Sequence, residues 1–345
     1  MKEEEIDMKK IEISRLNDLF SAISANQKLY IPADNKGQAQ FLPWVDGLEM
    51  TKQLNTVRSA KDLFFPQFEN LVAFEVQGKT VSVVENRDTV EPFVVFGVRA
   101  CDAASFDILD RVFLSDPVDT FYAARREHGT VVTLSCSMPE ETCFCTVFGV
   151  DPAEPKGDVS GWTAGEWLYL KANTEKGEAL LASLDLEDGD EAPVEEAKAA
   201  TRAVMEKLPL KDLDLETFDG DHLMEHFNNP AWDKLSQSCL GCGTCTFVCP
   251  TCQCYDVRDF DSGKGVQRFR CWDSCMYSDF TMMAHGTNRP TQKERFRQRF
   301  MHKLVYFPSN NDGIYGCVGC GRCLAKCPIS MNIVKVAKTL KEGKA

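Results

Sequence analysis

Apolar positions in the first part of the chain follow both a helical period and short continuous runs. Residues 9–26 space their apolar side chains like an amphipathic helix, and residues 28–32 predict a strand. Two further runs, 71–76 and 81–84, predict a β-hairpin. The run 92–98 is apolar throughout, which is typical of a parallel strand buried on both faces. This part of the chain is therefore predicted to combine helices with strands.

The run 92–98 opens a strand, helix and strand sequence. Helices are predicted at 103–114 and 118–128, and a second buried strand at 130–134. This order predicts a crossover unit with a parallel sheet. Further along, the pattern predicts a strand at 166–171 and helices at 177–184, 194–208, 222–235, within 289–303 and at 331–344. We expect an α+β protein, with an α/β domain at 1–220 that has a partly parallel sheet and an α-helical ferredoxin-type domain at 221–345.

Two copies of one cysteine pattern dominate the C-terminal part. The first runs from Cys239 through Cys242 and Cys245 to Cys249-Pro250, and the second consists of Cys317, Cys320, Cys323 and Cys327-Pro328. Each reads CxxCxxCxxxCP, the pattern with which bacterial ferredoxins bind [4Fe-4S] clusters. A zinc ribbon needs only two CxxC pairs, and a disulfide framework is typical of short secreted chains, so neither alternative explains the two complete copies.

In this pattern the fourth cysteine ligates the cluster of the other copy. We therefore assign two [4Fe-4S] clusters as follows: the first to Cys239, Cys242, Cys245 and Cys327, the second to Cys317, Cys320, Cys323 and Cys249. Glycines within both cysteine loops allow positive φ angles and let the backbone approach the cluster sulfides closely.

Four more cysteines follow the two predicted parallel strands. Cys101 comes after the first strand, Cys136 after the second, and Cys143 and Cys145 lie in the next loop. Parallel neighbours end at the same edge of a sheet, where open α/β sheets bind ligands. Two interpretations remain open: a third metal or iron-sulfur centre, or four thiols that only pack in the core.

The segment between the two ferredoxin runs has cysteines of its own. Cys252, Cys254 and Cys275 are weaker candidates for a metal site, and Cys271 and His285 lie in the same segment. A cluster, a zinc site and inert burial are all compatible with this spacing.

The basic run 289–303 is interleaved with Phe296 and Phe300. We expect a helix that turns these two rings inward and Arg295 and Arg299 outward, rather than an RNA-binding surface.

Composition limits the choice of function. The 345 residues are 43% hydrophobic and 26% charged, no apolar run reaches the length of a membrane span, and the start is acidic, so we expect a cytoplasmic protein. Sixteen cysteines suit a reducing compartment. From Ala231 onward the chain has 17 of its 39 Lys and Arg residues but only 9 of its 52 Asp and Glu residues. The acidic remainder argues against nucleic acid as a partner.

Several nucleotide and catalytic motifs are missing from the sequence. It has neither GxGxxG after a predicted strand nor GxxxxGK[ST], and neither HExxH nor a Ser, His and Asp set stands out. A cluster transfers single electrons, so a two-electron donor such as NAD(P)H requires a flavin. We therefore expect the flavin on a partner subunit.

A set of linked motifs resembles one family of iron-sulfur subunits. It comprises Phe65-Pro66, Glu69, Gly97-Val-Arg99-Ala-Cys101-Asp102, Arg125-Arg126, Cys143-Phe-Cys145, Cys249-Pro-Thr-Cys252-Gln-Cys254, Trp272-Asp-Ser-Cys275 and the final CxxCxxCxxxCP. The set resembles a family that includes an iron-sulfur subunit of anaerobic sulfite reductases and the beta subunit of soluble [NiFe] hydrogenases (sulfhydrogenases). Cys271 departs from the pattern expected of relatives.

The resemblance implies an electron relay in a hetero-oligomer. Such a relay connects a flavin and NAD(P)H subunit with a catalytic or electron-bifurcating subunit, for example a sulfite reductase or a hydrogenase. Two other functions remain open: a self-contained iron-sulfur reductase with its substrate at the edge formed by Cys101 and Cys136, and a zinc-binding interaction module.

Overall fold

The computed structural model describes residues 8–53, 55–84 and 89–342. The chain divides into two compact units. Unit 1 comprises Met1–Ala60, Glu91–Leu213 and Cys317–Arg322, and unit 2 comprises Lys61–Val90, Asp214–Gly316 and Cys323–Ala345. The predicted division into domains at 1–220 and 221–345 stays a prediction.

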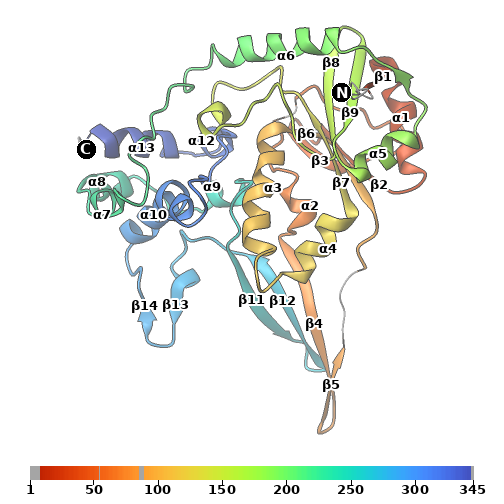
Figure 1. Ribbon diagram of the computed structural model, residues 1–345. Helices are drawn as coiled ribbons and strands as arrows, with labels where there is room; N and C mark the ends of the chain where they lie inside the picture. Colours follow the sequence, from red (N-terminus) through yellow and green to blue (C-terminus); the bar gives the residue numbers. More distant parts are fainter. Residues whose placement is uncertain (1–7, 54, 85–88, 343–345) are drawn as a thin grey trace. The chain divides into compact units, whose positions relative to one another are not determined.

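Unit 1 is organised around an eight-stranded sheet in the order β10-β1-β9-β8-β7-β6-β2-β3 (Figure 1). In chain order the strands are β1 (Met8–Glu12), β2 (Lys28–Asp34), β3 (Ala39–Pro43), β6 (Phe93–Arg99), β7 (Gly129–Leu134), β8 (Val159–Ala164), β9 (Trp167–Ala172) and β10 (Glu187–Asp188). Strands β2, β6, β7 and β8 are parallel neighbours, and the outer pairs are antiparallel. The predicted mixed class and partly parallel sheet are confirmed.

The centre of this sheet is buried on both faces. Every residue of β6 and β7 is buried, as predicted for parallel strands covered on both faces. The helices of unit 1 are α1 (Leu16–Ser24), α3 (Ala100–Phe113), α4 (Thr120–His128), α5 (Glu175–Ala182) and α6 (Ala192–Met205), with short turns η1 (Ile13–Arg15) and η2 (Cys145–Phe148). Helices α1 and α5 share one apolar core with the sheet. Helices α3 and α4 contact each other through Phe113 and Tyr122, whose ring centroids are 4.9 Å apart.

The predicted helix at 9–26 is wrong in its first part. Residues Met8–Glu12 form strand β1, which pairs antiparallel with β9 and β10, and α1 begins only at Leu16. Met8 and Ile11 are three residues apart, which suits one face of a helix but places them on opposite faces of a strand. Both are buried, in two separate apolar clusters. The unpaired backbone of β9 supplies hydrogen bonds that an isolated helix turn does not have, so the tertiary partner decides between the two.

A buried ion pair ties the segment Cys317–Arg322 to unit 1. Arg322 and Asp102 are 2% and 1% exposed at their side chains, and Arg322 Nη2 donates to Asp102 Oδ2 at 2.7 Å. Arg322 also donates to the backbone oxygen and the hydroxyl of Thr56. The guanidinium is therefore fully paired where it lies.

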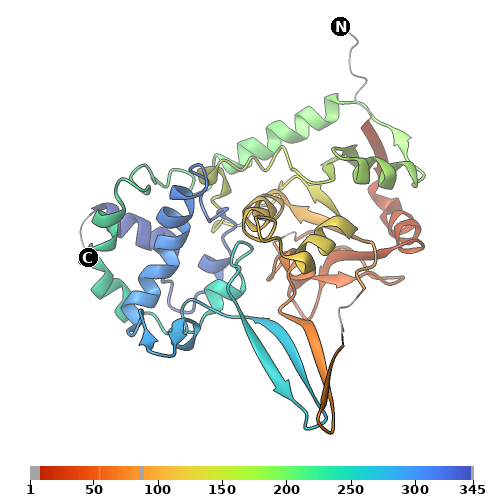
Figure 2. The same cartoon turned by 60° about the horizontal axis from the view of Figure 1, so that its bottom comes forward.

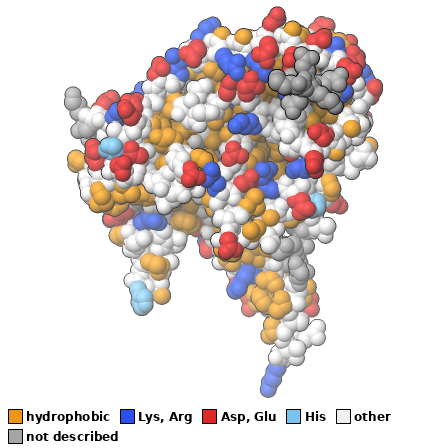
Figure 3. Space-filling view, viewed as in Figure 1, with side chains coloured by type: hydrophobic (Ala, Val, Ile, Leu, Met, Phe, Trp, Pro, Cys, Tyr) orange, Lys and Arg blue, Asp and Glu red, His pale blue; other side chains and the backbone are white. Residues whose placement is uncertain are grey.

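Unit 2 contains an antiparallel four-stranded sheet in the order β11-β12-β4-β5 (Figure 2). The strands are β4 (Phe68–Gln77), β5 (Thr80–Val84), β11 (Tyr255–Asp261) and β12 (Gly265–Trp272), and a short hairpin joins β13 (Met282–Met283) to β14 (Gly286–Thr287). The predicted hairpin at 71–84 is confirmed as β4 and β5. Apolar side chains of this hairpin lie on its surface, with Val81 61% and Val83 68% exposed (Figure 3).

Most helices of unit 2 are short. They are α2 (Lys61–Phe64), α7 (Leu223–Phe227), α8 (Ala231–Gln237), α9 (Thr244–Phe247), α10 (Gln292–Met301), η4, a π-helical turn (His302–Tyr306), α11 (Phe307–Ser309), α12 (Arg322–Ala325) and α13 (Ile333–Glu342), with η3 (Asp279–Thr281). The helix predicted at 222–235 is two helices, because Pro230 interrupts the backbone ladder. The helix predicted at 331–344 is α13, and its last two residues lie outside the described part. Because strands accompany these helices, the expected purely helical character is not confirmed.

The core of unit 2 is aromatic. Trp232 of α8 is fully buried, and its ring lies 6.1 Å from that of Phe296 and 6.4 Å from that of Phe300, both on α10. In the described ranges, no helix is both long and apolar enough to cross a membrane.

We predict that Asp102→Asn lowers the free energy of unfolding by about 3–5 kcal/mol, because it leaves the buried Arg322 cation without its counter-charge. Urea unfolding of the anaerobically purified protein measures this loss. The matched control is Asp188→Asn, which removes a carboxylate that is 93% exposed and pairs with Lys9. We expect no measurable change there, since exposed pairs contribute little. Equal losses in the two variants would contradict the account.

Candidate metal centres

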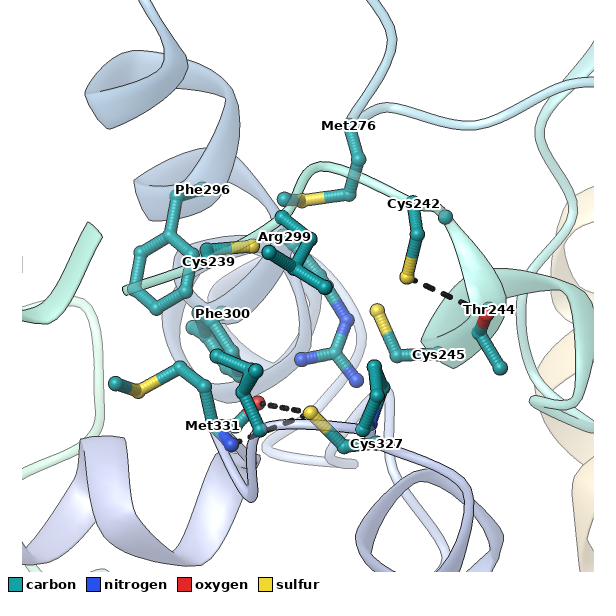
Figure 4. A pocket seen from close by; sticks show the side chains of 14 residues that line it. Cys239, Cys242, Thr244, Cys245, Met276, Phe296, Arg299, Phe300, Cys327 and Met331 are labelled. Carbon is teal, nitrogen blue, oxygen red and sulfur yellow. Dashed lines mark hydrogen bonds between the residues drawn. The ribbon is translucent and has the colours of Figure 1, made fainter. Parts of the chain in front are cut away.

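One pocket of unit 2 brings together four cysteines from both ferredoxin runs. Cys239, Cys242, Cys245 and Cys327 line it, together with Arg299 and a set of apolar side chains (Figure 4). These are the four residues that the cysteine pattern assigns to the first cluster. The fourth, Cys327, comes from the second copy, more than 80 residues further along the chain. The pocket thus brings cysteines of both copies together, as crossed ligation of the clusters requires.

The loop before α9 is shaped by glycine. Gly241 and Gly243 have φ angles of +66° and +71°, in the left-handed region that glycine adopts without strain. A Cβ atom on Gly243 would lie 2.5 Å from the hydroxyl of Tyr277, which donates to the Cys242 carbonyl at 3.2 Å. Glycine is thus required at this position both for the turn and for the close approach of the tyrosine.

Arg299 is the charged group of this pocket. Its side chain is 2% exposed, and its Nε and Nη1 atoms have no hydrogen-bond partner among the residues that the structure describes. Burial disfavours its cation, but the sulfur charges of Cys245 and Cys323 outweigh burial and raise its pKa. The expected outward orientation of Arg299 is wrong, because α10 turns it with Phe296 and Phe300 toward the cysteines. Arg295, the other arginine that was expected to face outward, is partly exposed.

The cysteines predicted for the second cluster come from both units. Cys317 and Cys320 belong to unit 1, whereas Cys249 and Cys323 belong to unit 2. Both cysteines of unit 2 lie near enough to Arg299 to raise its pKa. The assignment of these four to one cluster stays a prediction.

The weaker candidates of the intervening segment lie together in unit 2. The Cys252 thiol lies close enough to Cys249 to lower the pKa of Cys249, and the Cys275 thiol lies close to Cys254. The Cys275 contact lowers the pKa of Cys254 to about 7. The Lys303 ammonium faces both pairs and donates to the Thr251 hydroxyl at 2.7 Å.

A second lysine lies beside this group. Lys61, 2% exposed, donates to the carbonyl oxygens of Cys249 and Cys252 at 3.0 Å each, and its ammonium lies 3.6 Å from the centre of the Trp272 ring. Burial lowers its pKa. Two lysines thus stabilise the turn that carries these cysteines.

Two residues of the intervening segment lie elsewhere. Cys271 is on β12, opposite Asp256 of β11, and its electrostatic neighbours are Arg258 and Asp256 rather than thiols. His285 is exposed, between β13 and β14. Neither is positioned to complete a site with Cys252, Cys254 and Cys275.

Unit 1 contains the remaining four cysteines, arranged around Arg99. Strand β6 carries a bulge at Gly97, whose φ is +79°, and ends at Arg99; Cys101 lies in the first turn of α3. Cys136 lies two residues beyond β7. The Arg99 side chain faces the sulfur atoms of Cys101 and Cys136, and its Nη1 lies 3.9 Å from the Cys143 sulfur. Burial raises the pKa of Cys145, a neighbour of Cys136 and Cys143, to about 12.

The buried cations indicate whether these residues suit an iron-sulfur cluster. Among the described residues, no three His, Cys, Asp or Glu side chains converge closely enough to hold a single metal ion. Arg99 and Arg299 each leave two nitrogen atoms without a hydrogen-bond partner in the described structure, and each faces several thiols. A negatively charged group ligated by those thiols would compensate the cations, so the residues fit.

Pattern reasoning found the cysteines but not the buried cations. Arg99 has a weak signal, since it is a lone charge at the end of an apolar strand and directly precedes a cysteine motif. Lys61, Arg299 and Lys303 have none, because a basic residue on a short amphipathic helix is exposed far more often than not.

Comparisons with known proteins agree with this chemistry. Residues 238–331 match the family model described as 4Fe-4S dicluster domain. This part of the chain is therefore an iron-sulfur domain of the dicluster type. The chain as a whole belongs to the family of sulfhydrogenase beta subunits, which confirms the predicted resemblance. It is 34% identical over 282 residues to sulfhydrogenase 2 subunit beta of Pyrococcus furiosus, covering 78% of this chain and 79% of that protein. No solved structure matches the chain.

We predict that Gly97→Ala destabilises unit 1 by about 1–3 kcal/mol, because alanine is strained at this φ and its Cβ would lie 2.9 Å from the Pro32 ring. The free energy of unfolding in urea measures the loss. Gly47→Ala is the matched control, since Gly47 has a φ of +80° with nothing within 4 Å of the added Cβ. The control should lose clearly less stability; equal losses would mean that the contact with Pro32 does not matter.

Proposed function

We propose that the chain is the electron-transfer subunit of a multi-subunit oxidoreductase. It would pass single electrons between a partner that binds flavin and NAD(P)H and a catalytic or bifurcating partner such as a hydrogenase or a sulfite reductase. The observation that carries this proposal is the pocket in which Cys239, Cys242, Cys245 and Cys327 surround the buried cation Arg299.

In this proposal eight cysteines hold two [4Fe-4S] clusters. Cys239, Cys242, Cys245 and Cys327 bind the first, and Cys317, Cys320, Cys323 and Cys249 bind the second. A [4Fe-4S] cluster accepts and donates one electron at a time, which is the chemistry that a relay requires.

The chain's own residues set the conditions in the first pocket. Arg299 places a fixed positive charge beside the thiolates, which stabilises added negative charge and so raises the reduction potential. Phe296, Phe300, Met276 and Met331 line the same pocket and give it a largely apolar wall (Figure 4). Gly241 and Gly243 keep the loop backbone close to the thiolates, and the Gly241 amide donates to the Cys239 sulfur at 3.4 Å.

The motifs that the sequence lacks support the proposal of a flavin-bearing partner. It has no dinucleotide or nucleotide motif, so the two-electron step with NAD(P)H is assigned to a flavin on another subunit. The name of the Pyrococcus furiosus relative, sulfhydrogenase 2 subunit beta, supports membership in a complex of the hydrogenase type. The sixteen free cysteines favour the reducing cytoplasm as its location.

We predict that Cys327→Ser changes the iron content and the EPR spectrum of the reduced protein, while Cys271→Ser changes neither. Cys327 lines the first cluster pocket, whereas Cys271 lies on β12 away from the other thiols. Anaerobically purified protein should contain about eight irons or more with equal acid-labile sulfide, and Cys327→Ser should contain fewer.

The same preparation tests the relay itself. With NADH and a flavoprotein partner, the clusters of the wild-type protein should be reduced, as followed by loss of visible absorbance. A protein that holds both clusters but is never reduced through a flavoprotein would contradict the relay. A colourless, iron-free protein with bound zinc would favour the interaction module instead.

A specific observation also favours the second candidate function, a self-contained reductase. A cavity of about 270 Å³ in unit 1 is lined by Cys136, Leu134, Thr163, Met50 and other residues. This is large enough for a small substrate beside a thiol. The relay proposal predicts no turnover of sulfite by the isolated chain with a chemical reductant. Turnover that follows enzyme concentration would favour the reductase.

A further inference from the structure

The four cysteines of unit 1 meet at one edge of its sheet. Strands β6 and β7 are parallel neighbours, and the segments after them carry Cys101 and Cys136. Cys143 and Cys145 come from the next loop, at the start of η2. All four are buried, with exposed fractions of 3% to 8%. Buried thiols alone are common in protein cores, so their convergence needs a second observation before it indicates a ligand.

Arg99 supplies that observation. Its side chain is 2% exposed, and its Nε and Nη2 atoms have no hydrogen-bond partner in the described part of the chain. Nη1 contacts the Cys143 sulfur at 3.9 Å. Neutral thiols are weak acceptors and do not satisfy a guanidinium. An arginine buried in this position without a counter-charge would be strongly destabilising.

The nearby carboxylate is already in use. Asp102 follows Cys101 in the first turn of α3 and contributes to the electrostatic environment of Arg99. However, both of its oxygen atoms accept hydrogen bonds from Arg322, which is equally buried. One carboxylate therefore faces two buried guanidinium groups, which leaves an excess positive charge beside the four thiols.

From these contacts we propose that Cys101, Cys136, Cys143 and Cys145 ligate a further [4Fe-4S] cluster and that Arg99 compensates its negative charge. Four thiolates on such a cluster supply the negative charge that the surrounding protein lacks. Arg99 is a positioning and charge-compensating residue in this site rather than a ligand.

Contacts within unit 1 argue for a redox cluster rather than an isolated structural metal. The Phe144 amide, between Cys143 and Cys145, donates to the Gly319 carbonyl at 2.9 Å, and the Cys143 sulfur lies 3.9 Å from the Cys320 carbonyl. Cys320 also contributes to the charge environment of Cys101. The proposed site thus directly adjoins the loop that carries Cys317 and Cys320.

Glycine makes this close contact between the two loops achievable. Gly319, with φ of +60°, would place a Cβ atom 2.4 Å from the Phe144 carbonyl oxygen, and Gly321 would place one 2.6 Å from the Thr142 carbonyl oxygen. Both glycines stand in the second ferredoxin run. The second ferredoxin run therefore packs closely against the loop that carries Cys143 and Cys145, in addition to carrying ligands of the proposed second cluster.

The inference rests on the proposed function in one respect: Cys317 and Cys320 must themselves ligate a cluster for the new site to extend the relay. In that case unit 1 contains its own one-electron carrier, beside the loop of Cys317 and Cys320. The new site itself depends only on the residues of unit 1.

The test is metal analysis of the full-length protein, purified anaerobically, as wild type and as Cys145→Ser. Iron and acid-labile sulfide should each fall by about four per chain in Cys145→Ser. Cys271→Ser is the matched control and should keep the wild-type content. Unchanged iron in Cys145→Ser would overturn the proposal, and so would a loss of about one zinc instead of iron.

Folding and the two proposals can be told apart within the same experiment. Cys145→Ser should retain the EPR signals that Cys327→Ser changes, which shows that the protein is folded and that the ferredoxin clusters are present. If Cys145→Ser lost all clusters, Cys101→Ser would replace it, and retained ferredoxin signals with four fewer irons would be required there. Failure of the ferredoxin assignment appears separately, as wild-type protein without signals that respond to Cys327→Ser.

Arg99 provides a test that does not remove a ligand. Arg99→Leu should lower the iron content or shift the reduction potential of one cluster to more negative values, and Arg99→Lys should restore most of the effect because it retains the charge. If the thiols only packed, Arg99→Leu would leave both quantities unchanged. That result would contradict the role given to Arg99.

Discussion

Compensation of buried positive charge is the constraint on which the structure depends. Arg270 and Arg322 are buried and paired with carboxylates, Glu69 and Asp102 respectively. Arg99 and Arg299 are equally buried, but they face thiols and leave nitrogen atoms without partners in the described residues. Burying an unpaired charge costs several kcal/mol, so the two cysteine groups need a negative charge that the amino acids alone do not supply. The proposed thiolate-ligated clusters would provide it.

The backbone around both groups is arranged for close approach. In unit 1, strand β6 has a bulge at Gly97 and ends at Arg99, and Cys101 follows in the first turn of α3. In unit 2, Gly243 allows the loop of Cys242 to contact Tyr277. Such local features would let the cysteines share one cofactor, and in the proposed clusters the arginines would influence how readily that cofactor accepts an electron. In this proposal, stability and function rest on the same buried charges.

The sequence was sufficient for the central strands of unit 1, because β6 is a short, largely apolar run and β7 is rich in β-branched residues, and both are typical of buried parallel strands. The ferredoxin cysteines could also be predicted from the sequence, since two complete copies of the CxxCxxCxxxCP pattern leave few other interpretations. Strand β1 was missed because the spacing of Met8 and Ile11 suits a helix, whereas in the structure they are buried on opposite faces of a strand that pairs with β9. The inward turn of Arg299 was missed because its reason, the thiols facing it, comes from distant parts of the chain.

The most direct test of the account is the reduction potential of the cluster in the pocket of Cys239 and Cys327, measured by EPR-monitored titration of wild type, Arg299→Gln and Arg299→Lys. Removing the charge should make the potential more negative in Arg299→Gln, whereas Arg299→Lys should stay near wild type. An unchanged potential in Arg299→Gln, with the cluster still present, would show that the buried arginine does not compensate the cluster's charge. That outcome would contradict the central claim.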